Sequence, residues 1–334
     1  MSRGRQQPAR ALVADIGGTN ARFALACLET LDLTQTRQFL CSDYPTLAGA
    51  ACAYLQGLKE PPRHGALAVA APVVDEEVSF TNSPWSATGV ELRRATGLDH
   101  LLLLNDFEAL ALSLPYLRGE ELHQIGGAEP APHATRLVLG PGTGIGVAGL
   151  VWSGSGWVAV PGEGGHMSFA AQSPREVELT MRLRSGREHL SVERVLSGPG
   201  LAGLYGAIAA SHGKPAEPLP TSEVLTRALA GDDGIAVETL ETFVTWLGRF
   251  AGDAALVFGA RGGVYLGGGI APRMLQALST GAFRQAFEAK GRMRSLLAPI
   301  PIKVILAEFA ALKGAAAALR ARLARGDEPA PALT

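Results

Sequence analysis

The feature that most constrains the fold is a pattern that occurs twice in the chain. Residues 11–28 read ALVADIGGTNARFALACL, and residues 136–152 read RLVLGPGTGIGVAGLVW. In each stretch an apolar run leads into a glycine turn that contains a threonine, and a second apolar run follows, as is typical of a β-hairpin. Gly17 and Gly142, one from each turn, are 125 residues apart (142 minus 17). The repeat predicts a duplicated domain, each half of which contributes one glycine turn to a shared cleft.

Outside these hairpins, short apolar runs alternate with glycine turns and helical patterns, which favours an α/β fold. The length of 334 residues corresponds to about two domains, and a hydrophobic fraction of 47% is enough for a sizeable core. Residues 1–10 are polar and rich in arginine, whereas residues 327–334 are rich in proline and alanine. We expect both ends to be flexible.

Charge, cysteine content and hydropathy argue against several classes of protein. The net charge is -1, with 30 basic and 31 acidic residues, so we expect no nucleic acid and no membrane as partner. Cys27, Cys41 and Cys52 form neither a disulfide framework nor a C-x-x-C pair. The apolar run after the N-terminal arginines stops at Asp15, and the run 66–74 is too short to span a bilayer. These features predict a soluble, cytoplasmic protein.

The first glycine turn has the composition of a phosphate-binding segment. Glycines let the backbone approach phosphate oxygens closely, so that several N–H groups donate to them. An aspartate at the end of the preceding strand can hold a hydrated Mg2+ that bridges phosphates. A hairpin that needs glycine only for its geometry is an equally good explanation of the motif taken alone. The candidate residues are Asp15, Gly17, Gly18, Thr19 and Asn20.

The second turn, GPGTGIG from Gly140, lacks the lysine of a Walker loop and precedes a strand rather than a helix. Paired with the first turn, its Gly142, Thr143 and Gly144 become a second phosphate clamp. A later run, Gly267–Gly269, closes a strand and can let a flat base or ribose lie against the backbone. The alternative for this run is a plain strand-to-helix turn, with Pro272 starting the helix.

Asn105 and Asp106 stand where a buried strand, 100–104, leads into a helix predicted over 107–114. Ligands commonly bind at this edge of α/β proteins. A carboxylate there can accept a hydroxyl proton as general base, a contribution of about 10²–10⁴-fold in rate. The alternative, which an isolated Asn-Asp pair favours, is that one of the two merely caps the helix.

Three further polar residues are candidates for binding a sugar. Glu163 and His166 lie on one glycine turn (EGGH), where both can hydrogen-bond vicinal hydroxyls. One Glu and one His are too few ligands for zinc, and an ordinary surface turn is the simpler explanation of this motif alone. Glu193 follows Ser191, a predicted N-cap, so by itself it is best explained as a solvated glutamate in a first helical turn.

Taken in order, these motifs resemble those of the bacterial glucokinase family. The resemblance runs from about residue 11 to about residue 325. It is carried by DIGGTNARFA, LNDFEA, GGAEP, GPGTGIGVA, PGEGGH, ERVLSGPGL, and GGVYLGGGIAPR with GAFRQAFEAKGR. It implies an α/β, two-lobed, actin-like (ribonuclease H-like) fold with a deep interdomain cleft. The small lobe would comprise 11–115 plus about 307–325, and the large lobe 116–306.

The resemblance also implies an activity, the ATP-dependent phosphorylation of glucose to glucose 6-phosphate in a homodimer. Asp106 then corresponds to the catalytic base, and Asp15 to the Mg2+ site, through water. The first turn and Gly142–Gly144 correspond to the phosphate segments, and Gly267, Gly268 and Gly269 to the adenosine segment. The sugar ligands implied are Asn105, Asp106, Glu163, His166 and Glu193.

Other activities remain open at this point. The acceptor can be another hexose such as mannose, and the donor can be ADP or polyphosphate. A catalytically silent sugar-sensing regulator is the weaker alternative, because Asp106 and both glycine turns are present. The chain departs from the family pattern at Ala310–Gly314 (AALKG), where a flexible glycine-leucine-leucine-glycine stretch is replaced by residues that favour a helix.

Overall fold

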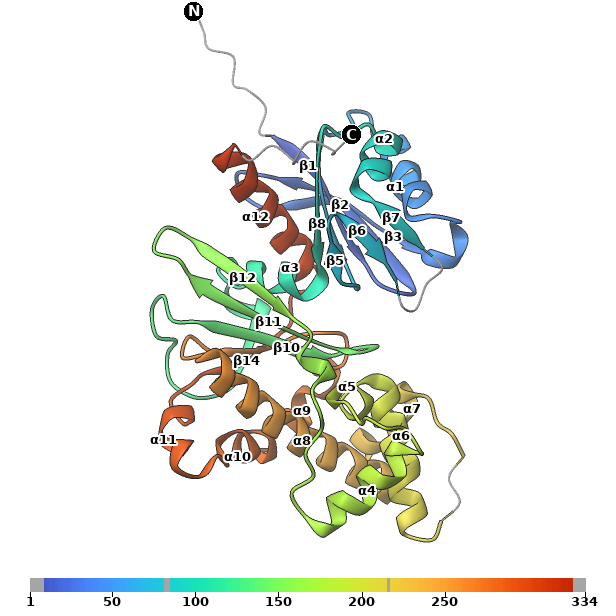
Figure 1. Ribbon diagram of the computed structural model, residues 1–334, viewed down its shortest axis with the longest axis vertical. Coiled ribbons are helices and arrows are strands. Elements are labelled where there is room, and N and C mark those ends of the chain that lie inside the picture. Colours follow the sequence, from blue (N-terminus) through green and yellow to red (C-terminus); the bar gives the residue numbers. More distant parts are fainter. Residues whose placement is uncertain (1–8, 81–84, 215–216, 327–334) are drawn as a thin grey trace, which may run out of the picture. The chain divides into compact units, whose positions relative to one another are not determined.

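The computed structural model describes residues 9–80, 85–214 and 217–326, and the chain divides into two compact units (Figure 1). Unit 1 joins the chain up to Leu117 with the chain from Glu308 onward, and unit 2 is Arg118–Ala307. Of the ends predicted to be flexible, 1–8 and 327–334 lie outside the described residues. The N-terminal expectation was wrong at Arg10, which begins the first strand because it pairs with Cys27.

Unit 1 is built on a five-stranded sheet in the order β3-β2-β1-β4-β8. Strands β1, β2 and β3 are antiparallel, whereas β1, β4 and β8 run parallel. A separate three-stranded sheet has the order β5-β6-β7. The strands are β1 (Arg10–Ile16), β2 (Asn20–Cys27), β3 (Leu33–Leu40), β4 (His64–Val69), β5 (Val73–Val74), β6 (Glu77–Ser79), β7 (Ser86–Thr88) and β8 (His100–Asn105).

Both faces of the five-stranded sheet are covered, because alternate residues of β1 enter two different cores. Leu12, Ala14 and Ile16 pack with residues of α1 and α2, whereas Ala11 and Val13 pack with residues of α3 and α12. This alternation is the period of two expected for a sheet buried on both sides. The helices are α1 (Leu47–Gln56), α2 (Gly89–Thr96), α3 (Asp106–Ser113) and α12 (Ala310–Arg325).

Unit 2 contains a six-stranded sheet in the order β12-β11-β10-β13-β14-β9. Strands β10, β11 and β12 are antiparallel neighbours, and β10, β13 and β14 run parallel. Strand β9 pairs antiparallel with β14. The strands are β9 (Leu122–Gly126), β10 (Arg136–Pro141), β11 (Ile145–Trp152), β12 (Trp157–Gly162), β13 (Val264–Leu266) and β14 (Ile302–Ile305).

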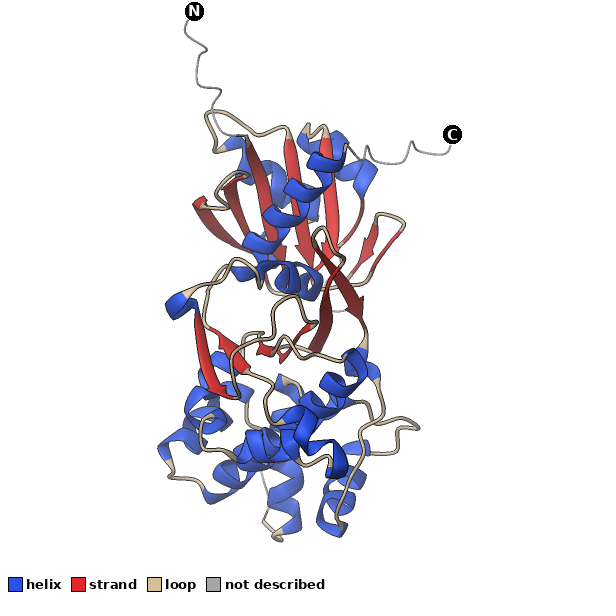
Figure 2. Ribbon diagram, turned by 90° about the vertical axis from the view of Figure 1, so that its left-hand side faces the viewer, coloured by secondary structure: helices blue, strands red, loops and turns tan. Residues whose placement is uncertain are grey.

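The core of unit 2 forms mainly between this sheet and its helices (Figure 2), and the 25-residue helix α8 contributes many of its buried residues. Trp246 and Phe243 of α8 are fully buried there. The helices are α4 (Pro174–Arg184), α5 (Val192–Val195), α6 (Gly198–Ser211), α7 (Thr221–Ala230), α8 (Gly234–Phe258), α9 (Leu275–Leu278), α10 (Ala282–Glu288) and α11 (Arg294–Leu297). Short 3-10 segments are 41–43, 119–121, 164–166, 271–274 and 291–293.

The predicted duplication is confirmed at the level of topology. In each unit a glycine-turn hairpin (β1–β2 or β10–β11) is extended by a third antiparallel strand on one side and by parallel strands on the other. The predicted N-cap Ser191 is also confirmed, since its side chain accepts from the N–H group of Arg194. The alternative for Gly267–Gly269, a turn into a helix that starts at Pro272, differs in detail, because Ala271–Met274 form a 3-10 segment before α9 begins.

Among the described residues, no helix is long and apolar enough to cross a membrane. The AALKG stretch lies in the first turns of α12, as its helix-favouring residues suggest. Gly314 in this stretch is where α12 meets α3, since a Cβ built there would stand 1.7 Å from the Ala109 carbonyl oxygen. Residue 314 must therefore lack a side chain for the two helices to pack as they do.

We predict that Gly314→Ala lowers the free energy of unfolding by about 3 kcal/mol, because the added methyl group would force α12 away from α3. The matched control is Gly206→Ala in α6, where a Cβ would meet nothing within 4 Å. That change removes a helical glycine and should stabilise by up to about 1 kcal/mol. Thermal unfolding of both variants checks this, and an unchanged melting temperature for Gly314→Ala would contradict the helix-packing argument.

Candidate active site

In unit 1 the candidate residues gather at the carboxyl ends of three parallel strands. The register places Asp15 of β1 beside Ala68 of β4, and Val69 of β4 beside Asn105 of β8. Adjacent strands are about 4.8 Å apart, so the ends of β1 and β8 are separated by roughly 10 Å. The sheet thus brings Asp15, the first glycine turn and the Asn105–Asp106 pair to one edge, where ligands bind in open α/β sheets.

The first turn spans Gly17, Gly18 and Thr19 between β1 and β2. The Gly17 N–H donates to the Asn20 carbonyl at 2.9 Å, and the Cys41 N–H donates to the Thr19 carbonyl at 2.8 Å. Gly17 does not adopt a positive φ, and a Cβ on it would meet only the Asn20 oxygen, at an ordinary 3.5 Å. Hairpin geometry therefore does not demand glycine at position 17, which favours the explanation that the space serves a ligand.

Asp15 faces Arg22 across the β1–β2 pair, and Arg22 Nη1 lies 3.4 Å from Asp15 Oδ2. Burial raises the pKa of Asp15, and the attraction of Arg22 only partly offsets this. Arg22 and Gln38 were not identified from the sequence, because their proximity depends on strand register. Gln38 accepts from Arg22 Nε at 3.1 Å and donates to Asn20 Oδ1 at 3.0 Å.

The donor set at this edge fits Mg2+ only if phosphate supplies further oxygens. Among the described residues, no group of three or more His, Cys, Asp or Glu side chains is arranged to hold a metal. Mg2+ bound with nucleotide phosphates needs one or two carboxylates and keeps several waters. Asp15, whose side chain is 25% exposed, can provide one such carboxylate through water.

Asn105, not Asp106, is the N-cap of α3. The Asn105 Oδ1 atom accepts from the N–H groups of Phe107 and Glu108 at 2.9 and 3.3 Å, and its Nδ2 donates to the Ala71 carbonyl at 3.3 Å. Asp106 is the first helical residue, and its Oδ1 accepts from the Phe107 N–H at 2.9 Å. Of the two candidate caps, Asn105 is therefore the residue that caps α3.

Glu108 completes the capping box by accepting from the Asn105 N–H at 3.4 Å. Burial raises the pKa of Glu108, and this backbone bond lowers it by less. The role of Glu108 was missed, although the spacing of Asn105 and Glu108 is the capping-box signal. With Asn105 and Glu108 fixing the first turn of α3, the half-buried Asp106 side chain is held in place at the strand end.

In unit 2 the second glycine turn and the triple-glycine run touch through their backbones. The Gly267 N–H donates to the Leu139 carbonyl at 2.9 Å, and the Ile270 N–H donates to the Pro141 carbonyl at 3.2 Å. A Cβ on Gly140 would lie 2.0 Å from the Gly267 oxygen. The predicted phosphate segment Gly142–Gly144 and the predicted adenosine segment Gly267–Gly269 are thus neighbours.

Glu193 and the EGGH turn meet the same hairpin at Ile145. The Glu193 Oε2 atom accepts from the Ile145 N–H at 3.2 Å, so Glu193 is not simply a solvated glutamate. A Cβ on Gly165 would lie 2.4 Å from the Ile145 oxygen, which shows how closely the EGGH turn packs there. His166 Nε2 and Glu163 Oε2 are 3.8 Å apart, and both side chains remain about 60% exposed (61% and 62%). Three predicted segments therefore converge on the start of β11.

The glycines of these turns differ in what requires them. Gly268 has a φ of +76°, so the fold itself demands glycine there. A Cβ on Gly144 would lie 2.2 Å from Glu193 Oε2, so glycine at position 144 leaves room for this carboxylate. Gly142 and Gly269 would meet nothing within 4 Å and have no positive φ. At Gly142, Gly269 and Gly17 the fold would accept a side chain, so glycine there leaves space above the backbone. These three glycines are the strongest candidates for close approach by a ligand.

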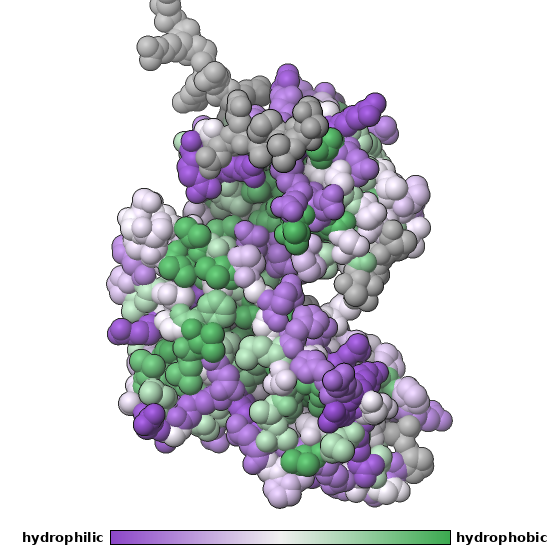
Figure 3. Space-filling model, in the orientation of Figure 1, coloured by the Kyte–Doolittle hydropathy of each residue, from purple (hydrophilic) through white to green (hydrophobic). Residues whose placement is uncertain are grey.

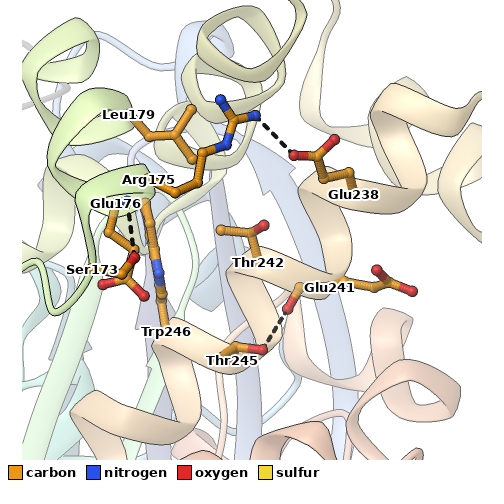
Figure 4. Close-up of a pocket in the computed structure, with 9 residues that line it drawn as sticks. All are labelled: Ser173, Arg175, Glu176, Leu179, Glu238, Glu241, Thr242, Thr245 and Trp246. Atoms are coloured by element: carbon orange, nitrogen blue, oxygen red, sulfur yellow. Dashed lines mark hydrogen bonds and ion pairs between the residues drawn. The ribbon is translucent and has the colours of Figure 1, made fainter. Parts of the chain in front are cut away.

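A separate cavity of about 250 Å³ between α4 and α8 contains none of the predicted site residues (Figure 4). Its charged groups are largely paired: Arg175 with Glu238 at 3.0 Å, and Glu176 with Arg249 at 2.7 Å. The surrounding charges hold α4 against α8, so we assign this cavity to the packing of unit 2.

Comparison with known proteins identifies the family. The glucokinase family model matches residues 12–322. A glucokinase from Neisseria meningitidis serogroup C is 46% identical over 310 residues, which cover 92% of this chain and 94% of that protein. This chain belongs to the glucokinase family.

Solved structures agree with this assignment. The crystal structure of a glucokinase from an Antarctic psychrotroph has a TM-score of 0.83 at 37% identity, with 94% of this chain and 100% of that chain covered. A ROK family glucokinase from Streptomyces griseus, solved in complex with glucose and AMPPNP, has a TM-score of 0.64 at 18% identity, with 94% of this chain and 100% of that chain covered. At that identity the likeness concerns the fold alone. The predicted fold class, an α/β sugar-kinase fold of the actin-like type, is confirmed.

We predict that Asp15→Asn makes this glucokinase-family chain more stable and less active. Because the folded state raises the pKa of Asp15 above its ordinary value of 3.8, the protonated form is favoured by folding and the charged form opposes it. The stability of the wild type relative to the variant should therefore fall as the pH rises through the raised pKa. Melting temperatures of both proteins from pH 4 to pH 9 check this, and a variant that is less stable at pH 9 would contradict it.

Proposed function

We propose that this chain is a glucokinase, which transfers the terminal phosphate of ATP to the 6-hydroxyl of glucose. Family membership over most of the chain supports this activity. The single structural observation that carries it is the position of Asp106, fixed at the end of β8 by the Asn105–Glu108 capping box. A carboxylate held there can take the proton of a hydroxyl as the phosphoryl group is transferred.

The proposed roles of the remaining residues follow from the two sets of candidate residues, one at the strand ends of unit 1 and one around the second glycine turn of unit 2. Asn105, Glu163, His166 and Glu193 bind sugar hydroxyls, and a sugar of wrong configuration would leave these polar groups unpaired. Asn105 has one Nδ2 hydrogen in its bond to Ala71, so the other is available to a ligand. Glu193 would connect sugar binding with phosphate binding in unit 2, because it also accepts from the Ile145 N–H beside the second glycine turn.

We propose that ATP phosphates lie against the first and second glycine turns, with Gly267–Gly269 against the adenosine. AMPPNP, an ATP analogue, is present in the Streptomyces griseus structure. When Mg2+ is bound, it neutralises phosphate charge, and Asp15 would hold it through water. Exclusion of water from bound glucose and MgATP would prevent hydrolysis of ATP. The proposal includes a homodimer and a cytoplasmic location, where ATP is available.

We expect Asp106→Asn to lower kcat by roughly 10²–10⁴-fold, because the amide still accepts from the Phe107 N–H but cannot take a proton. Glucose affinity should change little. The matched control is Asp99→Asn just before β8, where the exposed carboxylate pairs with Arg63 at the opposite end of the strand from Asp106. Steady-state kinetics and glucose titration check this, and near-wild-type turnover by Asp106→Asn would remove the base assignment.

Acceptor and donor breadth are tested separately. Glucose, mannose and other hexoses are offered with ATP, ADP or polyphosphate, and the product is identified. We expect glucose with ATP to give the highest kcat/KM. A clear preference for another acceptor or donor would replace the proposed substrate while leaving the phosphotransferase assignment in place.

A further inference from the structure

The loop that carries the EGGH turn lies beside the segment that leads into α5. Segments 166–169 and 189–193 form a short antiparallel pair, and this register sets His166 and Glu193 at the same end of it. The contacts of the pair are the Ser168–Ser191 bridge, the Phe169 N–H to the Leu190 carbonyl at 2.9 Å, and the Val192 N–H to the Met167 carbonyl at 2.8 Å. Two proposed sugar ligands are thus placed together by backbone pairing.

His189, at the other end of the pair, reaches back to the EGGH turn with its ring. His189 Nε2 lies 3.0 Å from the His166 carbonyl oxygen, and His189 Nδ1 lies 3.5 Å from Ser168 Oγ. A backbone carbonyl oxygen can only accept, so Nε2 carries the hydrogen and donates it. Nδ1 accepts from the Ser168 hydroxyl in the neutral ring and donates to that oxygen in the charged ring. The bond to His166 is therefore made in both charge states.

This bond meets a need of the EGGH turn. Residues 164–166 form a 3-10 segment, and a helical segment leaves its last carbonyls without partners inside the segment. His189 supplies the donor for the carbonyl of His166, the last residue of the segment. Because the carbonyl and the imidazole of His166 belong to one residue, a bond that fixes the carbonyl also restricts where the imidazole can point.

Packing does little to fix the His166 imidazole, because this side chain is 61% exposed. His189 is exposed as well. In the space-filling view, hydrophilic side chains gather on the surface around α5 (Figure 3). At such a surface the direction of a side chain depends on hydrogen bonds and on the backbone rather than on a surrounding core.

We propose that His189 is a positioning residue for the sugar site, which holds the His166 carbonyl and thereby directs the His166 imidazole toward a sugar hydroxyl. The inference rests on the proposed role of His166 as a sugar ligand and adds a residue that acts through it. His189 has no printed contact with the glycine turns or with Asp106 in this role, so its loss should weaken glucose binding and leave nucleotide binding and the chemical step largely intact.

The first test replaces the ring donor. We expect His189→Leu to raise the KM for glucose roughly 5-fold, the effect of losing one ordinary hydrogen bond, with little change in kcat or in the KM for ATP. His189→Gln should restore the wild-type KM, because its amide nitrogen reaches about as far as Nε2. His189→Asn is one methylene shorter and should behave like the leucine variant.

The matched control is His212→Leu at the end of α6. His212 is also exposed, and its Nε2 atom lies 2.7 Å from Glu238 Oε2. We expect this change to leave the KM for glucose at the wild-type value. Because His189 is exposed, its variants should melt at the temperature of the wild type. A raised KM that glutamine does not restore, or that follows a lowered melting temperature, would show a merely structural role and overturn the proposal.

The second test asks whether His189 acts through His166. Independent changes multiply in their effect on KM, whereas residues that act together do not. We expect His189→Leu to raise the KM for glucose clearly less when it is added to His166→Ala than when it is made in the wild type. Glucose titration of the same four proteins without ATP checks that KM follows binding. An equal effect in both backgrounds would overturn the proposal.

Failure of this inference and failure of the proposed function give different results. If His166→Ala raises the KM for glucose and His189→Leu does not, the positioning role alone is wrong. If His166→Ala leaves the KM unchanged, the proposed sugar ligand is wrong and the role of His189 falls with it. A wild type that phosphorylates no hexose would remove the proposed function itself.

Discussion

The close approach of backbone segments around the second glycine turn is the constraint on which the arrangement of unit 2 depends. The Gly267 carbonyl, the Glu193 carboxylate and the EGGH turn all contact the β10–β11 hairpin at places where a Cβ would collide. A methyl group at Gly140 or Gly165 would push one of these segments away, and one at Gly144 would displace the Glu193 carboxylate. Because interiors are close-packed, such a displacement would be transmitted to the side chains that each segment carries. The glycines in this region therefore determine how Glu163, His166 and Glu193 are placed.

Much of the fold could be predicted from local patterns, because the signals were local. The two hairpins follow from apolar runs around glycine turns, and Ser191 was identified as a cap from its position before a helix. The wrong predictions concern the ends of elements, which depend on the segments that lie next to them in the fold. Arg10 reads as part of a polar leader, yet pairing with Cys27 makes it a strand residue. Pro272 suits a helix start, yet only a 3-10 turn forms there before α9.

The candidate site was less accessible from individual motifs than the fold was. Asn105 and Asp106 are both good capping residues, and only the extended backbone of Asn105, with a ψ of 150°, shows which of them caps α3. Arg22 and Gln38 reach Asp15 and Asn20 only because β1, β2 and β3 are paired in one register. Glu193 is ordinary in its own helix and acquires a partner, Ile145, 48 residues earlier in the chain. The isolated motifs did not indicate a function. Their order along the chain did, because it resembles the order in the glucokinase family.

The duplicated hairpins show how one topology has been adapted to two environments. The register makes Asp15 and Arg22 of the first hairpin equivalent to Gly140 and Gly146 of the second. In unit 1 this position holds an ion pair whose carboxylate is the proposed Mg2+ site. In unit 2 the same position has no side chains, and the Gly267 backbone occupies the space beside Gly140. A carboxylate at position 140 would collide with that backbone, so the second hairpin can accept a neighbouring glycine turn only by giving up the charge. The proposed division between a metal-binding turn and a nucleotide-facing turn is thus a consequence of which hairpin retains side chains at this one position.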